Sequence, residues 1–210
     1  MIISKFTKLF LISTFFTLPY FVFAQNKEEK YVAIAETAKK YEIDNSHSSV
    51  SFEIAHLVIS TATGKFKRFQ GHFKFNPKDF TKTELEATAD VASVDTDNTQ
   101  RDEHLKKEDF FDAEKYPTMT FKSTSAKKTG ANTFDLTGDI NIRGVKKTVT
   151  FNITYNGELK SKAKEIVAFK GTTKINRKDF GINYNKIVEA TATVGDIVTI
   201  NINCEGVIKL

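Results

Sequence analysis

The chain has 210 residues, with 31 Lys and Arg, 26 Asp and Glu, and 40% hydrophobic residues. This ordinary globular balance excludes a wholly disordered chain, a collagen-like chain and a protein that crosses a membrane many times. The single cysteine, Cys204, excludes an intramolecular disulfide framework and any metal site made of several cysteine ligands.

Residues 1–24 have the pattern of a secretory signal peptide. Lys5 and Lys8 are their only charged residues, an apolar stretch follows, and Val22 and Ala24 supply the small residues of a cleavage site. We expect cleavage after Ala24, which places the mature chain in the periplasm or outside the cell. The alternative is an uncleaved membrane anchor, because the apolar stretch is almost long enough to span a bilayer.

The next segment, residues 25–40, is a charged N-terminal lead, compatible with either a short helix or a flexible stretch. Cleavage of the leader removes two lysines and no acids, so the formal net charge falls by two from +5. Such a mild basic excess is typical of solvated lysines and predicts no nucleic-acid partner.

From Tyr41 to Leu210 the sequence predicts one domain built from β-strands. Apolar residues alternate with polar residues in successive runs, which is the pattern of half-buried antiparallel strands. In each of the clearest runs the apolar residues occupy every second position. These runs are Val50, Phe52 and Ile54; Phe73 and Phe75; Leu85, Ala87 and Ala89; Met119 and Phe121; Phe134, Leu136 and Ile140; Val149, Phe151, Ile153 and Tyr155; and Val198, Ile200, Ile202 and Cys204. Phe66 and Phe69 break the alternation within one run, so we expect a β-bulge near Arg68.

One stretch is helical instead of extended. Thr99 followed by Asp102 resembles a capping box, and good helix formers continue to Glu108. We therefore expect a short helix over Thr99–Glu108, with Thr99 as its N-cap. Tyr116-Pro117 then restarts extended chain.

About eight or nine strands with one helical insertion fit a closed antiparallel barrel better than an open sheet, because closure leaves no exposed edge. The predicted fold class is therefore all-β. A barrel of about eight strands has an interior just wide enough to be filled by side chains or to hold one ligand.

The residues that carry chemistry form no catalytic or metal-binding motif. The four histidines lack close metal-ligand spacing, so we expect no metal. Cys204 has the parity of its apolar neighbours, which predicts a buried structural thiol. Asp44, His47 and Ser48 are compatible with an acid, base and nucleophile, but near a strand start such residues more often make local turn hydrogen bonds.

Several ordered motifs resemble the YceI-like family of periplasmic polyisoprenoid-binding proteins. The resemblance covers residues 41–204. The motifs are Asp44-Asn45-Ser46-His47-Ser48 with Val50 and Phe52; Gly64-Lys65-Phe66 with Phe69-Gln70-Gly71; Ala92 to Thr96; Arg101-Asp102-Glu103-His104-Leu105; Asp109-Phe110-Phe111-Asp112; Tyr116 to Ser123; Gly138 to Val145; and Ile175 to Gly181.

This resemblance implies a single lipocalin-like antiparallel β-barrel with a short helical insertion. It also implies a binding protein that holds a long-chain isoprenoid or a similar amphiphilic lipid, for carriage or storage, without a cofactor. The alternatives are an enzyme that acts on a lipophilic substrate, using His104 with Asp102, and a ligand-free, stress-associated structural barrel. As partners we expect the lipid and transient contact with a membrane, and we expect a monomer or a homodimer.

The strand pattern also predicts which side chains face the barrel interior. The twelve candidates for an apolar ligand-binding tunnel are Phe52, Ile54, Phe66, Phe73, Phe75, Leu85, Phe121, Leu136, Ile140, Phe151, Ile153 and Phe169. The alternative is that these side chains pack against one another and leave no cavity, because parity cannot show a void.

Polar residues of the motifs raise a second choice. Arg101, Asp102 and His104 could contact a ligand head group at the barrel mouth, or they could fix the helical insertion through a hydrogen-bond network. We favour the structural network. Arg143 and Arg177 present the same choice.

Overall fold

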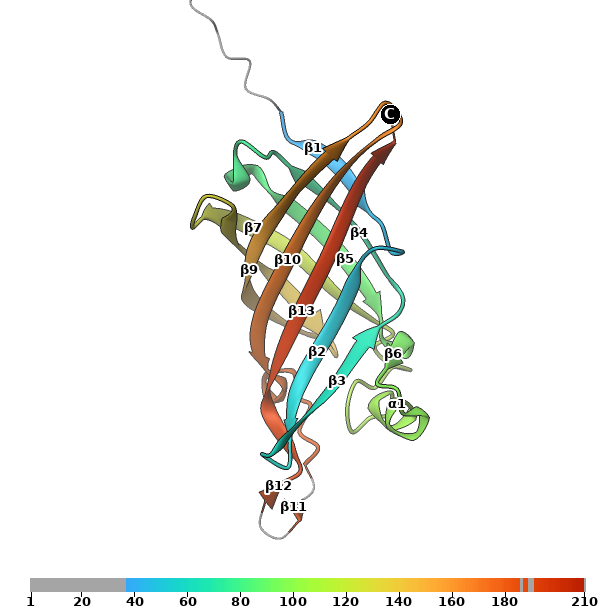
Figure 1. The fold of residues 1–210 in the computed structure, drawn as a ribbon. Helices are drawn as coiled ribbons and strands as arrows, with labels where there is room; N and C mark the ends of the chain where they lie inside the picture. Colours follow the sequence, from blue (N-terminus) through green and yellow to red (C-terminus); the bar gives the residue numbers. More distant parts are fainter. Residues whose placement is uncertain (1–36, 186, 189–190, 210) are drawn as a thin grey trace, which may run out of the picture. The chain divides into compact units, whose positions relative to one another are not determined.

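The computed structural model describes residues 37–185, 187–188 and 191–209 (Figure 1). The expected signal peptide, residues 1–24, lies outside the described residues. Of the expected lead segment, residues 25–40, residues 25–36 also lie outside the described residues, whereas residues 39–40 already belong to the first strand.

Eight antiparallel strands close into a barrel, which confirms the predicted all-β class. Each strand pairs with the next around the barrel, and pairing of β1 with both β4 and β13 completes the circle (Figure 1). In order around the barrel these strands are β1 (Lys39–Ile43), β4 (Phe69–Phe75), β5 (Glu84–Asp90), β7 (Thr118–Lys128), β8 (Thr133–Ile142), β9 (Val145–Lys160), β10 (Lys164–Asn176) and β13 (Val194–Lys209).

Two further strands extend the wall along β13. They are β2 (Ser49–His56) and β3 (Ser60–Phe66), and a two-residue strand, β6 (Val94–Asp95), pairs with β3. Because β1 pairs with β13 at Gly206 and Val207, and β2 pairs with the stretch from Val194 to Asn203, β1 and β2 occupy successive parts of the same edge. The first four strands thus form one long antiparallel hairpin. Its first arm consists of β1 and β2, its second arm of β3 and β4, and each arm bends between its two strands.

The bend between β3 and β4 replaces the predicted bulge at Arg68. The strand is interrupted at residues 67–68, where the backbone bonds the end of β5 and the 3-10 helix that follows it. Lys67 N–H donates to the carbonyl of Ser93 (3.1 Å), and Asp90 N–H donates to the carbonyl of Arg68 (2.9 Å). The interruption lets Phe66 and Phe69 face the same interior.

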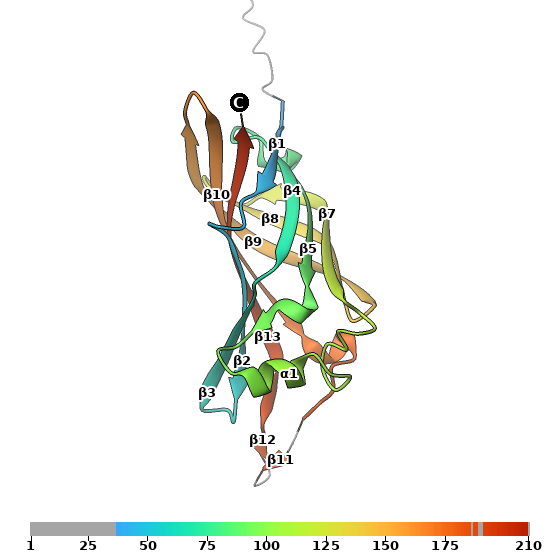
Figure 2. The ribbon, with the colours of Figure 1, turned by 90° about the vertical axis from the view of Figure 1, so that its right-hand side faces the viewer.

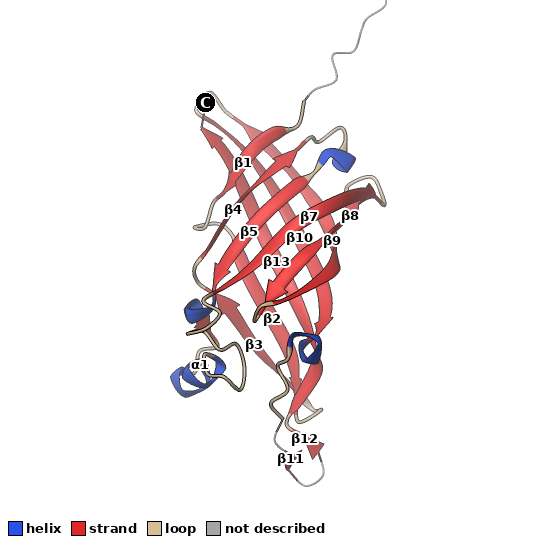
Figure 3. Cartoon of the chain, turned by 180° about the vertical axis from the view of Figure 1, so that it is seen from behind, coloured by secondary structure: helices blue, strands red, loops and turns tan. Residues whose placement is uncertain are grey.

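Short helices lie at the strand ends (Figure 3). They are the 3-10 helices η1 (Phe80–Lys82), η2 (Val91–Ser93) and η3 (Arg177–Phe180), and one α-helix, α1 (Thr99–Leu105); a two-stranded hairpin joins β11 (Ile187–Val188) to β12 (Thr191–Ala192). Within the described part of the chain, no helix is long and apolar enough to cross a membrane.

The helix α1 confirms the predicted insertion but corrects its ends. The N-cap is Asn98, not Thr99, because the Asn98 side chain accepts a hydrogen bond from Arg101 N–H (3.0 Å). Asp102 is therefore not part of a capping box, and its carboxylate accepts hydrogen bonds from Thr96 instead. The helix ends at Leu105, three residues before Glu108.

The barrel interior is solid at the end that carries η1 and the start of β10. We call this the packed end, and the opposite end, which carries α1, the cavity end (Figure 2). Aromatic rings fill the packed end: Phe75 contacts Phe169 edge-on at 4.7 Å between ring centroids and stacks on Phe80 at 5.7 Å. The buried members of this cluster are Tyr41, Phe73, Phe75, Phe80, Phe134, Leu136, Val167 and Phe169.

A buried carboxylate, Glu165, ties β10 to β1 at the packed end. Its side chain is 4% exposed and accepts hydrogen bonds from Lys39 Nζ (2.7 Å) and from the Tyr41 hydroxyl (2.5 Å). Burial alone would raise the pKa of this carboxyl, but the two hydrogen bonds outweigh burial and hold the pKa below its ordinary value of 4.5. Glu165 is therefore ionised in the folded chain.

This arrangement predicts an acid-sensitive contribution to stability. Because the pKa of Glu165 is lower in the folded than in the unfolded chain, its contribution is complete above about pH 4.5 and is lost as the pH falls through the folded pKa. The difference in free energy of unfolding between wild type and Glu165→Gln should therefore shrink from pH 7 to pH 3, as measured by urea denaturation. The exposed neighbour Glu42 provides the control, and Glu42→Gln should stay close to wild type at pH 7. An unchanged difference for Glu165→Gln across this range would contradict the assignment.

Candidate functional site

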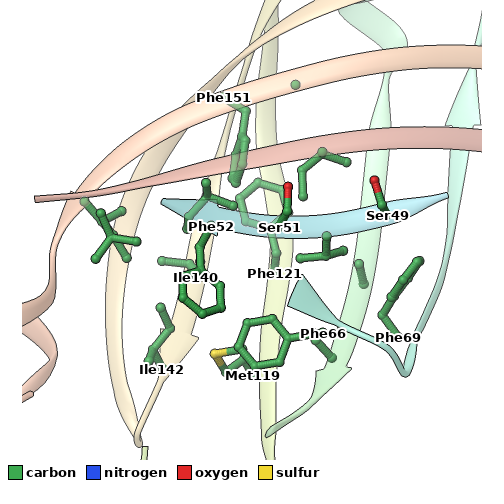
Figure 4. Close-up of a pocket in the computed structure, with 18 of the residues that line it drawn as sticks. Ser49, Ser51, Phe52, Phe66, Phe69, Met119, Phe121, Ile140, Ile142 and Phe151 are labelled. Carbon is green, nitrogen blue, oxygen red and sulfur yellow. The ribbon is translucent and has the colours of Figure 1, made fainter. Parts of the chain in front are cut away.

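A cavity of about 430 Å³ occupies the barrel between the packed end and α1. Its volume lies within the range of about 300–1,000 Å³ that is typical of small-molecule pockets. Side chains from both halves of the barrel face this space, with Phe52 on β2, Phe66 on β3, Phe121 on β7 and Ile140 on β8 (Figure 4). The wall is therefore almost entirely apolar.

Eleven of the twelve candidate tunnel residues line this cavity. They are Phe52, Ile54, Phe66, Phe73, Leu85, Phe121, Leu136, Ile140, Phe151, Ile153 and Phe169. Phe75 does not line it, because this ring lies one inward position further along β4 than Phe73 and packs under η1 against Phe80. That these residues contact a ligand stays a prediction.

The wall also contains residues that the candidate set left out. Ile200 and Ile202 share the parity of Val198 on β13 and could have been found from that alternation. Phe110 and Phe111 lie in the loop after α1, where no strand parity applies. Phe111 contacts the Phe66 ring at 5.7 Å, so this loop contributes to the wall at the cavity end.

Arg101 and Asp102 form a network with Thr96, the buried residue that precedes α1. Thr96 N–H and its hydroxyl both donate to Asp102 Oδ1, at 2.8 and 2.6 Å. Arg101 donates through Nε to Thr96 Oγ1 and through Nη2 to the Thr96 carbonyl, both at 2.8 Å. The network attaches α1 to Thr96, which directly follows β6; whether these residues also contact a ligand stays a prediction.

His104 is separate from this network. Its Nε2 lies 3.2 Å from Asp109 Oδ2, and its ring lies edge-on to Phe110 and Tyr184 at centroid distances of 5.0 and 4.9 Å. Asp102 and His104 are thus engaged with different partners: Asp102 bonds Thr96, and the carboxylate that pairs with His104 is that of Asp109. His104 does lie on the cavity wall, together with Arg101.

The Thr96 network predicts a measurable loss of stability. In Asp102→Ala two donors of Thr96, which is 7% exposed, lose their acceptor. An unsatisfied buried donor costs about 1–3 kcal/mol, so we expect urea denaturation to show a loss of that size. Asp109→Ala, which removes the exposed partner of His104, should cost clearly less. Equal losses for the two variants would show that Thr96 does not depend on Asp102.

Two arginines hold the loops at the cavity end. Arg177 donates to the carbonyls of Gly195 (2.7 Å), Ile182 (2.8 Å) and Tyr184 (2.7 Å). Arg143 donates to the carbonyls of Gly181 (2.5 Å) and Glu108 (2.9 Å). Both guanidinium groups thus donate to backbone carbonyls, while the buried Nε of Arg143 has no hydrogen-bond partner among the described residues.

Cys204 is half-buried on the cavity wall, and the turn between β1 and β2 is held by side-chain hydrogen bonds. Burial raises the pKa of the Cys204 thiol to about 12, so the thiol is protonated at neutral pH, as expected for a structural cysteine. Asp44 accepts hydrogen bonds from Ser46 N–H (2.9 Å) and pairs with His47 Nδ1 (3.0 Å). Hydrogen bonding to His47 lowers the pKa of Asp44, and the same contact raises the pKa of His47.

These turn residues are the part of the described chain that comes nearest to a metal site. The ligand atoms of Asp44, His47 and Glu205 lie within 4.8 Å of one another. However, Asp44 and His47 already pair with each other, and Ser48 Oγ accepts a hydrogen bond from Glu205 N–H (2.9 Å). These hydrogen bonds explain the close approach of the three side chains as a contact that stabilises the turn between β1 and β2.

Comparisons with known proteins agree with this architecture. The YceI-like domain family matches residues 41–206. A UPF0312 protein of Pseudomonas putida is 36% identical over 173 residues, which cover 81% of this chain and 87% of that protein. The crystal structure of a Campylobacter jejuni YCEI protein is 34% identical, covers 82% of this chain and 98% of its own, and has a TM-score of 0.64.

A polyisoprenoid binding domain from Saccharophagus degradans, implicated in plant cell wall breakdown, is a more distant structural neighbour. It is 15% identical, with a TM-score of 0.58, over 81% of this chain and 98% of its own. At that identity the likeness concerns the fold alone. The YceI-like family model matches most of this chain, and the P. putida and C. jejuni proteins are each more than 30% identical to it. This chain therefore belongs to the YceI-like family.

Proposed function

We propose that this chain is a binding protein that holds a long-chain isoprenoid or a similar amphiphilic lipid inside its barrel, for carriage or storage. The observation that supports this most is the apolar cavity, which is blocked by aromatic rings at the packed end and extends to α1 at the other. An elongated apolar chain fits such a space. The polyisoprenoid-binding activity named for the S. degradans domain supports the ligand class by analogy of fold.

The energetics favour a long apolar tail over a small polar ligand. Each buried methylene contributes roughly 0.8 kcal/mol, so one five-carbon unit contributes a few kcal/mol. Several units would exceed real affinity limits unless the cost of ordering the chain offset much of the gain. Tail length is therefore the property to which this cavity should respond most strongly.

Two alternatives remain to be tested against this proposal. An enzyme acting on a lipophilic substrate would need His104 to act with a partner, and His104 faces the cavity but pairs with the exposed Asp109 instead of Asp102. A ligand-free structural barrel would have no use for a cavity of this size, because filling it with larger side chains would add packing contacts.

Mass spectrometry of an organic extract of the purified protein tests the proposal. We expect the same long-chain lipid to recur in independent preparations, at an amount comparable with that of the protein. A protein that carries no lipid after expression and binds none when it is supplied would overturn the proposal. Turnover of the bound lipid that disappears in His104→Ala would instead establish the enzyme.

We further propose that the protein acts in the periplasm or outside the cell. This follows from the basic and then apolar leader that ends at Ala24. N-terminal sequencing of the protein from an envelope or culture fraction should give Gln25 as the first residue. An intact Met1 on a membrane-embedded chain would favour the anchor instead.

A further inference from the structure

The hairpin that joins β2 to β3 presents apolar side chains to solvent. We call residues Leu57, Val58 and Ile59 the β2–β3 tip. The Val58 side chain is 78% exposed and Ile59 is 89% exposed, the two highest values among the large exposed hydrophobic residues of the described chain. Exposed apolar residues are ordinary when they are scattered singly, but two consecutive ones at the end of a projecting hairpin need a reason.

The backbone of the tip makes this choice of residues costly. Leu57 has φ of 51° and Val58 has φ of 66°, both in the left-handed region. Hairpin turns with such angles normally contain Gly, Asn or Asp, and a β-branched residue such as Val is among the least favoured there. Stability alone therefore favours a polar turn at this position, so the apolar side chains point to a role outside folding.

The tip is fixed to the barrel and is not a loose loop. Leu57 N–H donates to the carbonyl of Thr193 (3.0 Å), and Ser60 Oγ donates to the carbonyl of His56 (3.0 Å). The strand residues next to the tip, Ala55 and His56, line the cavity. Figures 1 and 2 show the β2–β3 tip and α1 at the same end of the barrel, which is the cavity end.

The surrounding sequence is also suited to a water-poor environment. Residues 54–64 contain no Asp, Glu, Lys or Arg, although 27% of the whole chain is charged. Inserting the tip into an apolar phase therefore desolvates no charged side chain of this segment. Hydroxyl side chains follow directly at Ser60 and Thr61, where they can face lipid head groups.

We propose that the β2–β3 tip inserts into the surface of a phospholipid bilayer and docks the cavity end of the barrel against it. This inference rests on the proposed function, because docking would place the cavity next to the membrane from which a lipid is taken or to which it is given. The size of the tip decides between a bilayer and a protein partner. A stable protein interface buries about 800 Å² on each side, from about 20–30 residues, whereas a bilayer accepts a few apolar side chains.

Flotation with large unilamellar vesicles of phosphatidylethanolamine and phosphatidylglycerol tests this docking. The variant Val58→Ser with Ile59→Ser should lower vesicle binding by about tenfold or more, because two apolar side chains no longer leave water. Leu159 provides the matched control, since it is 63% exposed on β9 near the β9–β10 turn at the packed end (Figure 1). Leu159→Ser should bind vesicles as wild type does, and all variants should carry the same N-terminus.

A second measurement follows insertion directly. The chain contains no Trp, so Ile59→Trp and Leu159→Trp each introduce a single fluorophore. Addition of the same vesicles should shift the emission of Ile59→Trp to shorter wavelength and leave that of Leu159→Trp unchanged. Equal vesicle binding by wild type and the double serine variant, or no spectral shift for Ile59→Trp, would overturn the inference.

The lipid content of the double serine variant separates this inference from the proposed function. Because residues 57–59 do not line the cavity, the purified variant should still be able to hold lipid when the lipid is supplied in detergent. Retained lipid with vesicle binding unaffected by the serine changes would refute the docking tip and leave the proposed function standing. Tip-dependent vesicle binding by a protein that never holds lipid would refute the proposed function and not the membrane contact.

Discussion

Arg177→Ala should lower the free energy of unfolding by roughly 3–5 kcal/mol, because the change leaves three backbone carbonyls without a donor and each unsatisfied buried group costs about 1–3 kcal/mol. Arg177 is 3% exposed, and its guanidinium bonds the carbonyls of Ile182, Tyr184 and Gly195. These carbonyls belong to the two chain segments that flank the β11–β12 hairpin. Loss of the guanidinium should therefore loosen the cavity end as well as destabilise the barrel.

The neighbouring residue provides a matched control for this prediction. Lys178 lies in the same 3-10 helix, but its ammonium is exposed and pairs with the exposed Asp196 at 2.8 Å, a carboxylate that Arg177 approaches less closely, at 3.4 Å. An exposed pair of this kind contributes about 0–1 kcal/mol, so Lys178→Ala should be nearly neutral. Arg177→Lys should behave like Arg177→Ala, because one ammonium cannot reproduce the planar set of donors. Urea denaturation measures all three, and a near-neutral Arg177→Ala would contradict the assigned role.

The barrel itself could be predicted from the sequence because its strands are half-buried. Alternation along β8 and β9 places Leu136, Ile140, Phe151 and Ile153 inside and their polar neighbours outside, and closure of the sheet follows from the number of such strands. Hydrogen bonds of Arg101 and Asp102 beside the short helix could also be expected, because motif residues of mixed charge often make such networks. The position of the cavity along the barrel could not be predicted from the sequence.

Parity identifies the face of a strand but not the height along the barrel axis. Phe73 and Phe75 have the same parity and both belong to the packed-end cluster, yet only Phe73 also lines the cavity. The difference arises from η1, which brings Phe80 over one end of the barrel and leaves the other end hollow. Such a contact depends on the path of a loop, which no local alternation reports.

The same limit explains the two corrected local features. Asn98, and not Thr99, caps α1, and the Asp102 carboxylate that a capping box would use bonds Thr96, which directly follows β6. The interruption at residues 67–68 depends in the same way on hydrogen bonds to Ser93 and Asp90. Both features are set by tertiary neighbours and could not follow from the residues of one segment.

The hollow half of the barrel leads to the last prediction, which concerns ligand length. Ile153 on β9 lines the cavity opposite Gly171 on β10, where an added Cβ would lie 2.8 Å from the Ile153 Cδ1 atom. The absent side chain at Gly171 thus makes room for Ile153, and a larger residue at 153 must extend toward the cavity. We expect Ile153→Phe to shorten the longest lipid chain that co-purifies with the protein.

The effect on selection should be large even though the substitution is small. A tail that is shorter by one five-carbon unit loses a few kcal/mol of burial, at roughly 0.8 kcal/mol per methylene, and each 1.4 kcal/mol is a tenfold change in affinity. Lipids of the original length should therefore be depleted by about a hundredfold or more relative to shorter ones. Liquid chromatography with mass spectrometry of extracts from wild type and variant measures this ratio.

Val149→Phe is the control, because Val149 lies on the same face of β9 but packs against the Ile140 and Ile142 cluster without lining the cavity. Val149 is half-buried and contacts the outer side of cavity-wall residues, so a larger side chain there is overpacked against the wall, at a cost of up to about 1–3 kcal/mol, and should leave the lipid length unchanged. Ile153→Phe should lose less stability, because the ring enters a space that is already hollow. If a folded Ile153→Phe protein carries the same lipids in the same amounts as wild type, this strand does not limit the length of the bound chain. If both variants lose equal stability and neither changes the lipid, residue 153 faces a packed core instead of a ligand.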